Sequence, residues 1–206
     1  MLRCMERYRI AESEANTEGE LSRYAPLVQT LLQNRGISTA EEADAFLYPD
    51  FDKDLHDPFL FTDMEKSVER ILKAITDNES IVIYSDYDCD GIPGGVLLHD
   101  FLTKIGHSNF YNYIPHRHNE GYGFNEESVP RFVEEKVDLI ITVDCGIVDV
   151  KATKAAMEAG IDVIITDHHE VVGDLPPAYA ILNPKRDDAY PFDGLCGTGV
   201  AFKLVQ

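Results

Sequence analysis

The sequence predicts an α/β fold, a doubly wound parallel sheet preceded by a small helical N-terminal segment. From about residue 79 onward, short runs rich in β-branched residues alternate with helical stretches, which is typical of a parallel sheet wrapped by helices. Before that point the apolar residues recur at helical spacing instead. We therefore expect a helical region over residues 1–78 and an α/β domain over residues 79–206.

The expected elements follow from these patterns in chain order. In the N-terminal region an apolar stripe predicts a helix over residues 21–32, which the glycine at position 36 ends. Two Ser/Thr-x-x-Glu patterns, at 38–41 and 62–65, predict capping boxes at the starts of two further helices. We expect strands at 80–84, 110–114, 139–143, 162–166 and 179–182. We expect helices near 94–105, 126–135, 149–159 and 198–206.

Composition limits the classes of function. The chain has 206 residues, 44% of them hydrophobic, which is enough for one well-packed core. Its formal net charge is −19. Proteins that hold nucleic acid by its phosphates usually present basic patches, so the charge disfavours a grip on long DNA by this chain alone. An acidic chain can still cleave phosphodiesters where bound metal ions reverse the local potential.

The expected location is cytoplasmic. No run of about 18 apolar residues occurs, and residues 1–10 mix charged with apolar positions, unlike the core of a signal peptide. The four cysteines form no Cys-x-x-Cys pair, which favours free thiols in a reducing compartment.

Three polar clusters directly follow predicted strands. They are Asp86, Asp88 and Asp90 after 80–84, Asp144 after 139–143, and Asp167, His168 and His169 after 162–166. The carboxyl ends of parallel strands share one edge of the sheet, so these side chains are expected to converge. Carboxylates crowded together repel one another unless a cation neutralises them. The sequence therefore predicts a divalent metal site.

Each cluster also has a simpler interpretation when taken alone. The first fits a solvated acidic turn, Asp144 fits a helix cap, and the two histidines fit an exposed loop. An EF-hand is excluded, because Leu97 stands where the twelfth-position glutamate would be. Three metal-capable strand ends on one sheet edge favour the metal site over the three separate interpretations.

The ligand chemistry favours manganese or magnesium. Carboxylates with imidazoles suit these ions, whereas thiolates suit zinc. Cys89 and Cys145 lie inside the clusters, but their spacing fits no zinc motif, so we expect both to be small buried residues beside the ligands. A pair of such cations supplies the activation of water and the charge neutralisation that phosphoryl hydrolysis requires.

Arg117 is a candidate for contact with a phosphate. It lies in the segment 115–125, which follows a predicted strand and is therefore near the same edge. A guanidinium can donate two parallel hydrogen bonds to a phosphate. The alternative is an ordinary loop in which Asn125 caps the next helix and Arg117 pairs with Glu120. Both interpretations stay open.

Five segments together resemble the DHH phosphoesterase superfamily, and within it the bacterial exonucleases that degrade single-stranded DNA from its 5′ end. The segments are 83–92, 143–147, 166–170, 181–185 and 195–203, and the likeness extends to 34–37 and 55–60. The resemblance implies metal-dependent phosphodiester hydrolysis with Mn²⁺ or Mg²⁺ in a two-metal site. It implies single-stranded DNA as the substrate, with a single-strand-binding protein or a helicase as further partners.

The resemblance also implies roles for individual residues. His169 would face the scissile phosphate, and Asp144 would bridge the two ions. The implied metal ligands are Asp86, Asp88, Asp90, Asp144 and His168. The family's fourth metal motif and its DNA-gripping domains would lie beyond residue 206, so the resemblance predicts a chain truncated at its C-terminal end.

The sequence departs from the family pattern after the first motif, where Pro93, Gly94 and Gly95 replace residues that are usually Thr and Ala. Two glycines would weaken a helix start by about 1 kcal/mol each relative to alanine. Two other functions remain as alternatives. One is an inactive DHH-fold module that docks on a replication or repair partner. The other is an oligonucleotide or cyclic-dinucleotide phosphodiesterase, which Tyr84 disfavours because those relatives carry histidine there.

Overall fold

The computed structural model describes residues 19–186 and 190–206, and it confirms an α/β fold with a parallel sheet preceded by a helical segment. The chain divides into two compact units, residues 1–55 and 56–206. The sheet lies entirely in the second unit. Residues 56–78 also belong to this second unit, and the boundary at 78/79 that the sequence suggests is close to the start of the first strand.

The first unit contains short helices around a small core of Leu21, Leu32 and Ala43. Its elements are the 3₁₀ helix η1 (Glu20–Arg23), α1 (Pro26–Gln33) and α2 (Ala40–Leu47). The prediction of one helix over 21–32 is wrong. Pro26 occupies the first position of α1 and has no N–H for the preceding turn, so a new helix begins there.

The first capping box lies one residue later than predicted. Thr39 Oγ1 accepts from the backbone N–H of Glu42 at 3.2 Å, and Glu42 Oε2 accepts from the N–H of Thr39 at 3.1 Å. The glutamate also accepts from the N–H of Ser38 at 3.0 Å. The N-cap is therefore Thr39 and not the predicted Ser38, and α2 begins at Ala40.

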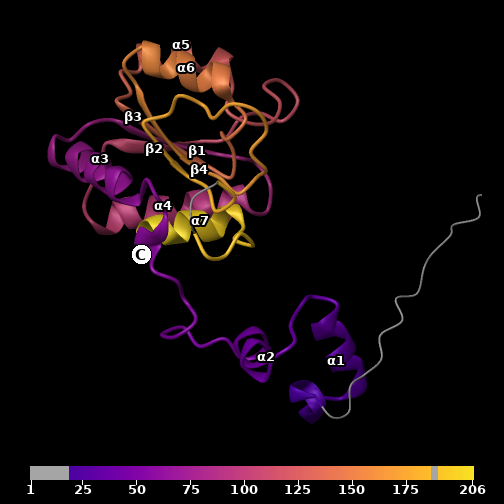
Figure 1. The fold of residues 1–206 in the computed structure, drawn as a ribbon. Coiled ribbons are helices and arrows are strands. Elements are labelled where there is room, and N and C mark those ends of the chain that lie inside the picture. The colour runs from indigo at the N-terminus through magenta and orange to yellow at the C-terminus, as the bar shows by residue number, and fades with distance from the viewer. Residues whose placement is uncertain (1–18, 187–189) are drawn as a thin grey trace, which may run out of the picture. The chain divides into compact units, whose positions relative to one another are not determined.

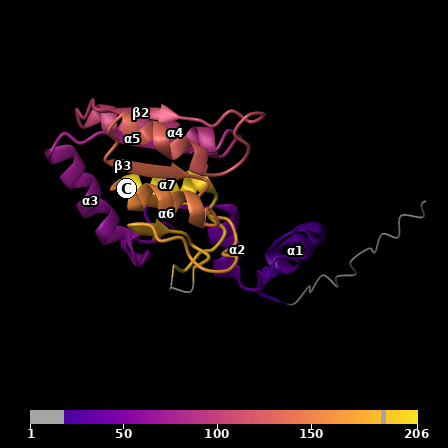
Figure 2. The same cartoon turned by 90° about the horizontal axis from the view of Figure 1, so that it is seen from above.

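The second unit is built on five parallel strands in the order β2-β1-β3-β4-β5. Figures 1 and 2 show this unit in two views at right angles. The strands are β1 (Ile81–Ser85), β2 (Phe110–Tyr113), β3 (Leu139–Val143), β4 (Asp162–Thr166) and β5 (Ala180–Leu182). All five predicted strands are present, with bounds shifted by a residue at most at each end. Because β1, β3 and β4 are neighbours, their carboxyl ends lie side by side.

Helices cover both faces of the sheet (Figure 1). One face carries α3 (Met64–Thr76), α4 (Gly91–Lys104) and α7 (Gly197–Val205), and the other carries α5 (Val129–Glu134) and α6 (Val150–Glu158). Side chains of β1 alternate between the faces, with Ile81 and Ile83 in the first core and Val82 and Tyr84 in the second. The short 3₁₀ helices η2 (Pro58–Leu60) and η3 (Glu126–Ser128) precede α3 and α5.

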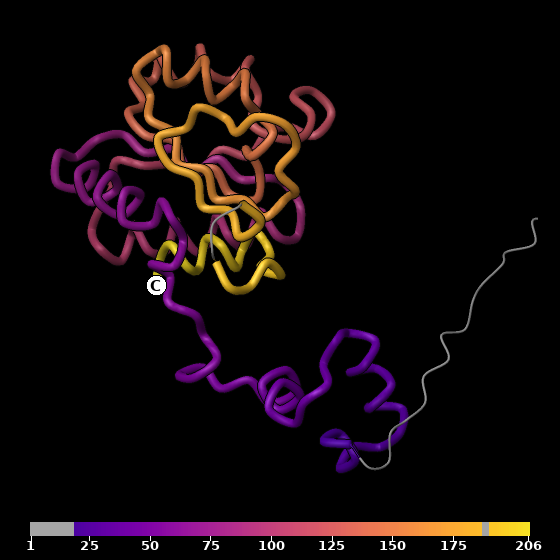
Figure 3. The backbone as a smooth tube through the Cα atoms, viewed as in Figure 1, coloured from indigo at the N-terminus to yellow at the C-terminus, as the bar shows by residue number. Residues whose placement is uncertain are grey.

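The last helix returns to the first part of the domain. The trace of α7 runs beside α4, although the two are about a hundred residues apart (Figure 3). The predicted capping box at 62–65 is absent, because α3 has Asp63 as its N-cap without a side-chain cap bond. Asp63 Oδ2 accepts instead from the N–H of Ile181 at 3.0 Å and from Arg186 at 2.8 Å, which attaches the start of α3 to β5.

Helix α4 begins at Gly91, three residues earlier than predicted, and includes Gly94 and Gly95. A Cβ atom on Gly94 would lie 2.6 Å from Val143 Cγ1, closer than real carbon atoms approach. The glycine therefore lets the first turn of α4 pack directly on β3. Packing against the sheet thus favours glycine here, although helix propensity favours alanine.

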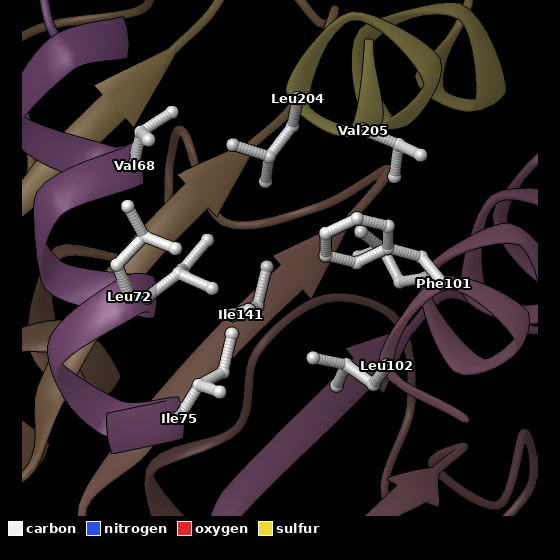
Figure 4. Close-up of a pocket in the computed structure, with 10 residues that line it drawn as sticks. Val68, Leu72, Ile75, Phe101, Leu102, Ile141, Leu204 and Val205 are labelled. Atoms are coloured by element: carbon white, nitrogen blue, oxygen red, sulfur yellow. The ribbon is translucent and has the colours of Figure 1, made fainter. Parts of the chain in front are cut away.

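An apolar pocket lies between α3, α4 and α7 (Figure 4). Leu72, Phe101, Leu204 and Val205 surround it above Ile141 of β3, and every lining side chain is a hydrocarbon. Such a pocket offers no group for acid–base chemistry or metal binding. Within the described ranges, no helix combines the length and apolar character needed to cross a membrane.

Candidate metal centre

Three aspartates occupy equivalent positions at the ends of adjacent strands. Asp86 follows β1, Asp144 follows β3 and Asp167 follows β4. The backbone N–H of each donates to a carbonyl oxygen at the end of the neighbouring strand, at 3.1, 2.9 and 3.0 Å respectively. The ladder of the sheet thus extends to these residues, and all three side chains are about 1% exposed. The sheet brings together acidic groups that are far apart in the sequence.

Asp144 is common to two groups of side chains that can share a cation. One ligand atom each from Asp86, Asp88 and Asp144 lie within 4.8 Å of one another, and the same holds for Asp144, His168 and His169. The backbone of Asp144 is left-handed, with φ of 62°, a region that aspartate tolerates better than most residues. This turn places its carboxylate between the loop after β1 and the loop after β4.

The electrostatics of these carboxylates fit a hard divalent cation. Asp86 Oδ1 and Asp144 Oδ1 are buried and have no hydrogen-bond partner, a costly condition for a buried acceptor. Burial together with the carboxylates of Asp90 and Asp88 raises the pKa of Asp144 to about 8, and burial raises the pKa of Asp86. His168 Nε2 lies 3.1 Å from Asp144 Oδ1. A cation between these groups would neutralise the repulsion and satisfy the buried oxygens.

Asp88 and Asp90 have further structural partners. Asp88 Oδ1 accepts from the N–H groups of Gly91 and Asp90 at 2.9 and 2.8 Å, and these bonds lower its pKa. Asp90 accepts from the N–H groups of Gly197 and Thr198, at 2.6 and 2.8 Å, at the start of α7. Asp90 belongs to neither close group among the described residues, although its Oδ2 lies 3.7 Å from His168 Nε2. It joins the loop after β1 to α7 at the side of the site.

Asp167 organises the two histidines. Its Oδ1 accepts from His169 Nδ1 at 2.7 Å and from the N–H groups of His168 and His169 at 2.7 and 3.1 Å. Its Oδ2 accepts from the N–H of Ile147 at 2.9 Å. Burial raises the pKa of Asp167, but the bonds from His169 and Ile147 outweigh it and lower the pKa overall. The same contact raises the pKa of His169.

The sequence reasoning gave Asp167 no role, although a signal was present. It is the first residue after β4, the same position that Asp86 and Asp144 hold after their strands.

Arg117 lies beside the loop that follows β1. Its guanidinium carbon is 5.1 Å from the centroid of the Tyr87 ring. The alternative pairing with Glu120 is not the contact seen, because Glu120 accepts from the Tyr113 hydroxyl and from the N–H of His116. Asn125 precedes η3 without a side-chain cap bond.

Tyr122, from the same segment, was not singled out by the sequence reasoning. Its hydroxyl oxygen is 3.2 Å from His169 Nε2.

The cysteines separate into two environments. Cys145 is buried as predicted, whereas Cys89 is exposed, so the expectation for Cys89 is wrong. Cys89 lies in the loop after β1 and not on the strand, where side chains pack into the core. The described cysteines, Cys89, Cys145 and Cys196, are free thiols, and Cys4 lies outside the described residues.

These features define a class of protein, a parallel α/β domain whose central strands gather, at their carboxyl ends, side chains that can hold divalent metals. Residues 80–206 match the family described as "DHH family, N-terminal domain". The chain belongs to this family.

Curated relatives extend the comparison to most of the chain. The single-stranded-DNA-specific exonuclease RecJ of Bacillus subtilis is 48% identical over 183 residues, which cover 88% of this chain and 23% of that protein. RecJ of Escherichia coli is 34% identical over 200 residues, which cover 97% of this chain and 33% of that protein. The resemblance to these exonucleases is confirmed, and the chain spans about a quarter to a third of their length.

Solved structures agree with the fold. A crystal structure of exonuclease RecJ bound to manganese is 32% identical with a TM-score of 0.66, covering 73% of this chain and 38% of that one. RecJ of Thermus thermophilus in complex with Mn²⁺ is 26% identical with a TM-score of 0.69, covering 91% of this chain and 26% of that one.

Proposed function

We propose that this protein is the metal-binding part of an exonuclease that hydrolyses phosphodiester bonds at the 5′ end of single-stranded DNA. The observation that carries the proposal is the convergence of Asp86, Asp88, Asp144, His168 and His169 at one edge of the sheet. The named activity of the RecJ relatives and the manganese bound to two of their structures support it.

The metal ligands in this proposal are Asp86, Asp88, Asp144 and His168, with Mn²⁺ or Mg²⁺ as the ions. Asp144 belongs to both close groups, which supports a bridging position. Asp90 closes the side of the site toward α7 and completes the acidic set through its 3.7 Å approach to His168. When bound, the divalent cations supply Lewis-acid polarisation of the phosphoryl group and activation of water.

His169 serves in this proposal as the group that faces the scissile phosphate. Asp167 holds its Nδ1, so the Nε2 nitrogen is the one left to meet an oxygen of the substrate. Arg117, beside the loop after β1, is the proposed contact with a further phosphate. Tyr87 and Tyr122, whose ring centroids are 6.4 Å apart, lie between Arg117 and His169 and offer aromatic surfaces to unstacked bases.

Single-stranded DNA is the proposed partner, with a single-strand-binding protein or a helicase as further partners, in the cytoplasm. The charge of −19 means that attraction for the DNA backbone must come from bound cations and from local groups such as Arg117. A cyclic-dinucleotide phosphodiesterase is not favoured. Tyr84, which stands at its expected histidine position, is fully buried and donates to the Gly123 carbonyl at 3.0 Å.

Nucleotide release from labelled single-stranded DNA tests the proposal. We expect Mn²⁺-dependent release from a 5′-labelled strand, and an increase of Tm on addition of Mn²⁺ alone. Asp144→Asn keeps the left-handed backbone available and removes the charge, so it should lower release roughly 100-fold or more, because the metals contribute several kcal/mol. Asp100→Asn, on the exposed face of α4, is the matched control and should behave as wild type.

Three results would contradict the proposal in whole or in part. Wild-type chain that releases no nucleotides, whether or not Mn²⁺ raises its Tm, would favour the inactive binding module. Equal release by Asp144→Asn and Asp100→Asn would show that the activity does not depend on this metal centre. Faster release from a 3′-labelled strand would support hydrolase activity but contradict digestion from the 5′ end.

A further inference from the structure

A tyrosine hydroxyl reaches the imidazole that the proposed reaction depends on. Tyr122 Oη lies 3.2 Å from His169 Nε2 and 3.4 Å from His169 Nδ1. It also lies 3.4 Å from the carbonyl oxygen of Asp144, to which it can donate. The two rings meet nearly edge to face, with centroids 5.9 Å apart and planes at 81°. The hydroxyl therefore contacts both the loop after β3 and the loop after β4.

The backbone directly after Tyr122 is anchored by hydrogen bonds at Gly123 and Phe124. The carbonyl oxygen of Gly123 accepts from the Tyr84 hydroxyl at 3.0 Å and from Asn125 Nδ2 at 3.1 Å. The N–H of Phe124 donates to Asp149 Oδ2 at 2.7 Å. Although Tyr122 itself is half exposed, the backbone of the two residues that follow it makes three buried or partly buried hydrogen bonds.

Gly123 shows how closely this loop is fitted. Its φ is +85°, and a Cβ atom there would lie 2.8 Å from Asp149 Oδ2. Only glycine meets both conditions, because other residues disfavour positive φ and the carboxylate leaves no room for a side chain. The loop is thus fixed against α6, the helix that Asp149 precedes.

The opposite side of His169 is held by Asp167. The 2.7 Å contact of its Nδ1 with Asp167 Oδ1 favours a proton on Nδ1 and leaves Nε2 unengaged by Asp167. The Tyr122 hydroxyl, nearly equidistant from the two ring nitrogens, lies against the ring itself and away from the in-plane lone pair of Nε2, while its proton is placed to go to the Asp144 carbonyl oxygen. Asp167 therefore restrains the ring through Nδ1, and the Tyr122 hydroxyl restrains it by contact with the ring, which leaves Nε2 open toward the substrate.

We propose that Tyr122 is a positioning residue that fixes the orientation of the His169 imidazole. It acts through His169, which is the group that faces the scissile phosphate, so the inference rests on the proposed function. The hydroxyl limits rotation of the ring and keeps Nε2 at the edge shared by Asp144 and His168. Outer contacts of this kind commonly change activity by about 10- to 100-fold when they are removed.

Imidazole nitrogen resonances give a readout that does not require turnover. In the metal-free chain, long-range ¹H–¹⁵N spectra resolve the seven histidines, and His169→Asn assigns the His169 signals. Tyr122→Phe keeps the aromatic ring and removes only the hydroxyl. We expect it to shift the His169 Nε2 resonance and leave the other histidine signals in place. Tyr87→Phe, which alters the neighbouring ring in the same way, is the matched control and should leave His169 unchanged.

Kinetics then separate positioning from substrate binding. In the nucleotide-release assay Tyr122→Phe should lower kcat about 10-fold with KM nearly unchanged, since DNA contacts are retained. Unmoved His169 resonances in Tyr122→Phe, or a raised KM at constant kcat, would overturn the inference. Wild-type chain without turnover would contradict the proposed function instead, and the spectra would still decide whether the hydroxyl holds the imidazole.

Discussion

At the scale of single residues, the centre is built from side chains whose roles differ in kind. Asp86 and Asp144 present buried oxygens without hydrogen-bond partners, which suits a cation. Asp167 is equally buried, but both of its oxygens are already engaged by the protein. We infer that Asp167 shapes the site without joining it. Because its Oδ1 also accepts from the backbone N–H of His168, a proposed ligand, loss of this carboxylate should weaken metal binding through the shape of the loop.

Asp167→Asn tests this division of roles. The amide cannot accept at both of its ends, so either His169 Nδ1 or the N–H of Ile147 loses its acceptor. We expect a loss of stability of about 1–3 kcal/mol and a 10- to 100-fold weaker Mn²⁺ affinity. Urea unfolding and calorimetric titration with Mn²⁺ measure the two effects.

Asp174→Asn, at an exposed position after the same strand, is the control and should match wild type in both measurements. Wild-type Mn²⁺ affinity in Asp167→Asn would show that the histidine loop keeps its shape without the carboxylate.

Residue types predicted the site better than they predicted individual roles. The acidic and histidine residues after the strands were visible in the sequence, and the structure brings most of them together. The contact of Asp90 with α7, and the contact of Tyr122 with His169, were not predictable. Each joins segments separated by many residues, so it depends on the packing of loops that carry no periodic pattern.

At the scale of elements, the strands agreed with their predicted positions because β-branched, fully apolar runs have few alternative structures. Helix starts were less predictable. The predicted cap at 38–41 failed because the neighbouring Thr39 makes the cap bond, and the cap at 62–65 failed because the N-cap is Asp63, whose side chain bonds to Ile181 and not to α3. Helix α4 began early because its glycines meet the sheet, a contact that helix propensity does not describe.

Gly94→Ala tests whether close packing on β3 or helix propensity has the larger effect on stability at this position of α4. Alanine favours the helix by about 1 kcal/mol over glycine, but its Cβ would lie 2.6 Å from Val143 Cγ1. Overpacking of a tight core usually costs about 1–3 kcal/mol, so we expect a net loss of stability in urea unfolding. Asp100→Ala, on the exposed face of α4, controls for propensity and should be neutral or slightly stabilising. A Gly94→Ala variant more stable than wild type would contradict close packing as the reason for the glycine.

At the scale of the whole domain, a second charged network lies at the opposite end of the same strands. Arg70 of α3 is 6% exposed and contacts Glu79, before β1, at 2.6 Å, and Asp162, at the start of β4, at 2.5 Å. Its Nη2 donates to the Asp138 carbonyl, before β3, at 3.3 Å. One guanidinium therefore gathers the amino ends of β1, β3 and β4, whose carboxyl ends carry the candidate metal centre.

This network predicts a dependence of stability on pH. Burial raises the pKa of Glu79, but hydrogen bonds from Lys73 and Arg70 outweigh it and lower the pKa overall. A carboxylate with a lowered folded-state pKa stabilises the protein above its unfolded pKa of about 4.3, and the benefit is lost as pH falls through the folded value. Glu79→Gln should therefore be less stable than wild type at pH 7 by roughly 1.5–3 kcal/mol.

The difference between wild type and Glu79→Gln should narrow as the pH falls below about 4.3, when urea unfolding is measured from pH 7 to pH 3. Glu134→Gln, at an exposed position on α5, should show a small difference at every pH. A gap for Glu79→Gln that stays constant over this range would mean that the charge of Glu79 does not stabilise the fold.

The strand order has a consequence for how the protein acquires its metals during synthesis. Asp86 precedes His168 by 82 positions, and β2 is inserted in the chain between β1 and its partner β3. On the ribosome, a nascent chain that has exposed only β1 and β2 possesses one fragment of the ligand set. The full set of ligands can then bind metal ions only after β4 has emerged and paired with β3. Metal binding would therefore indicate that the central strands of the sheet have assembled.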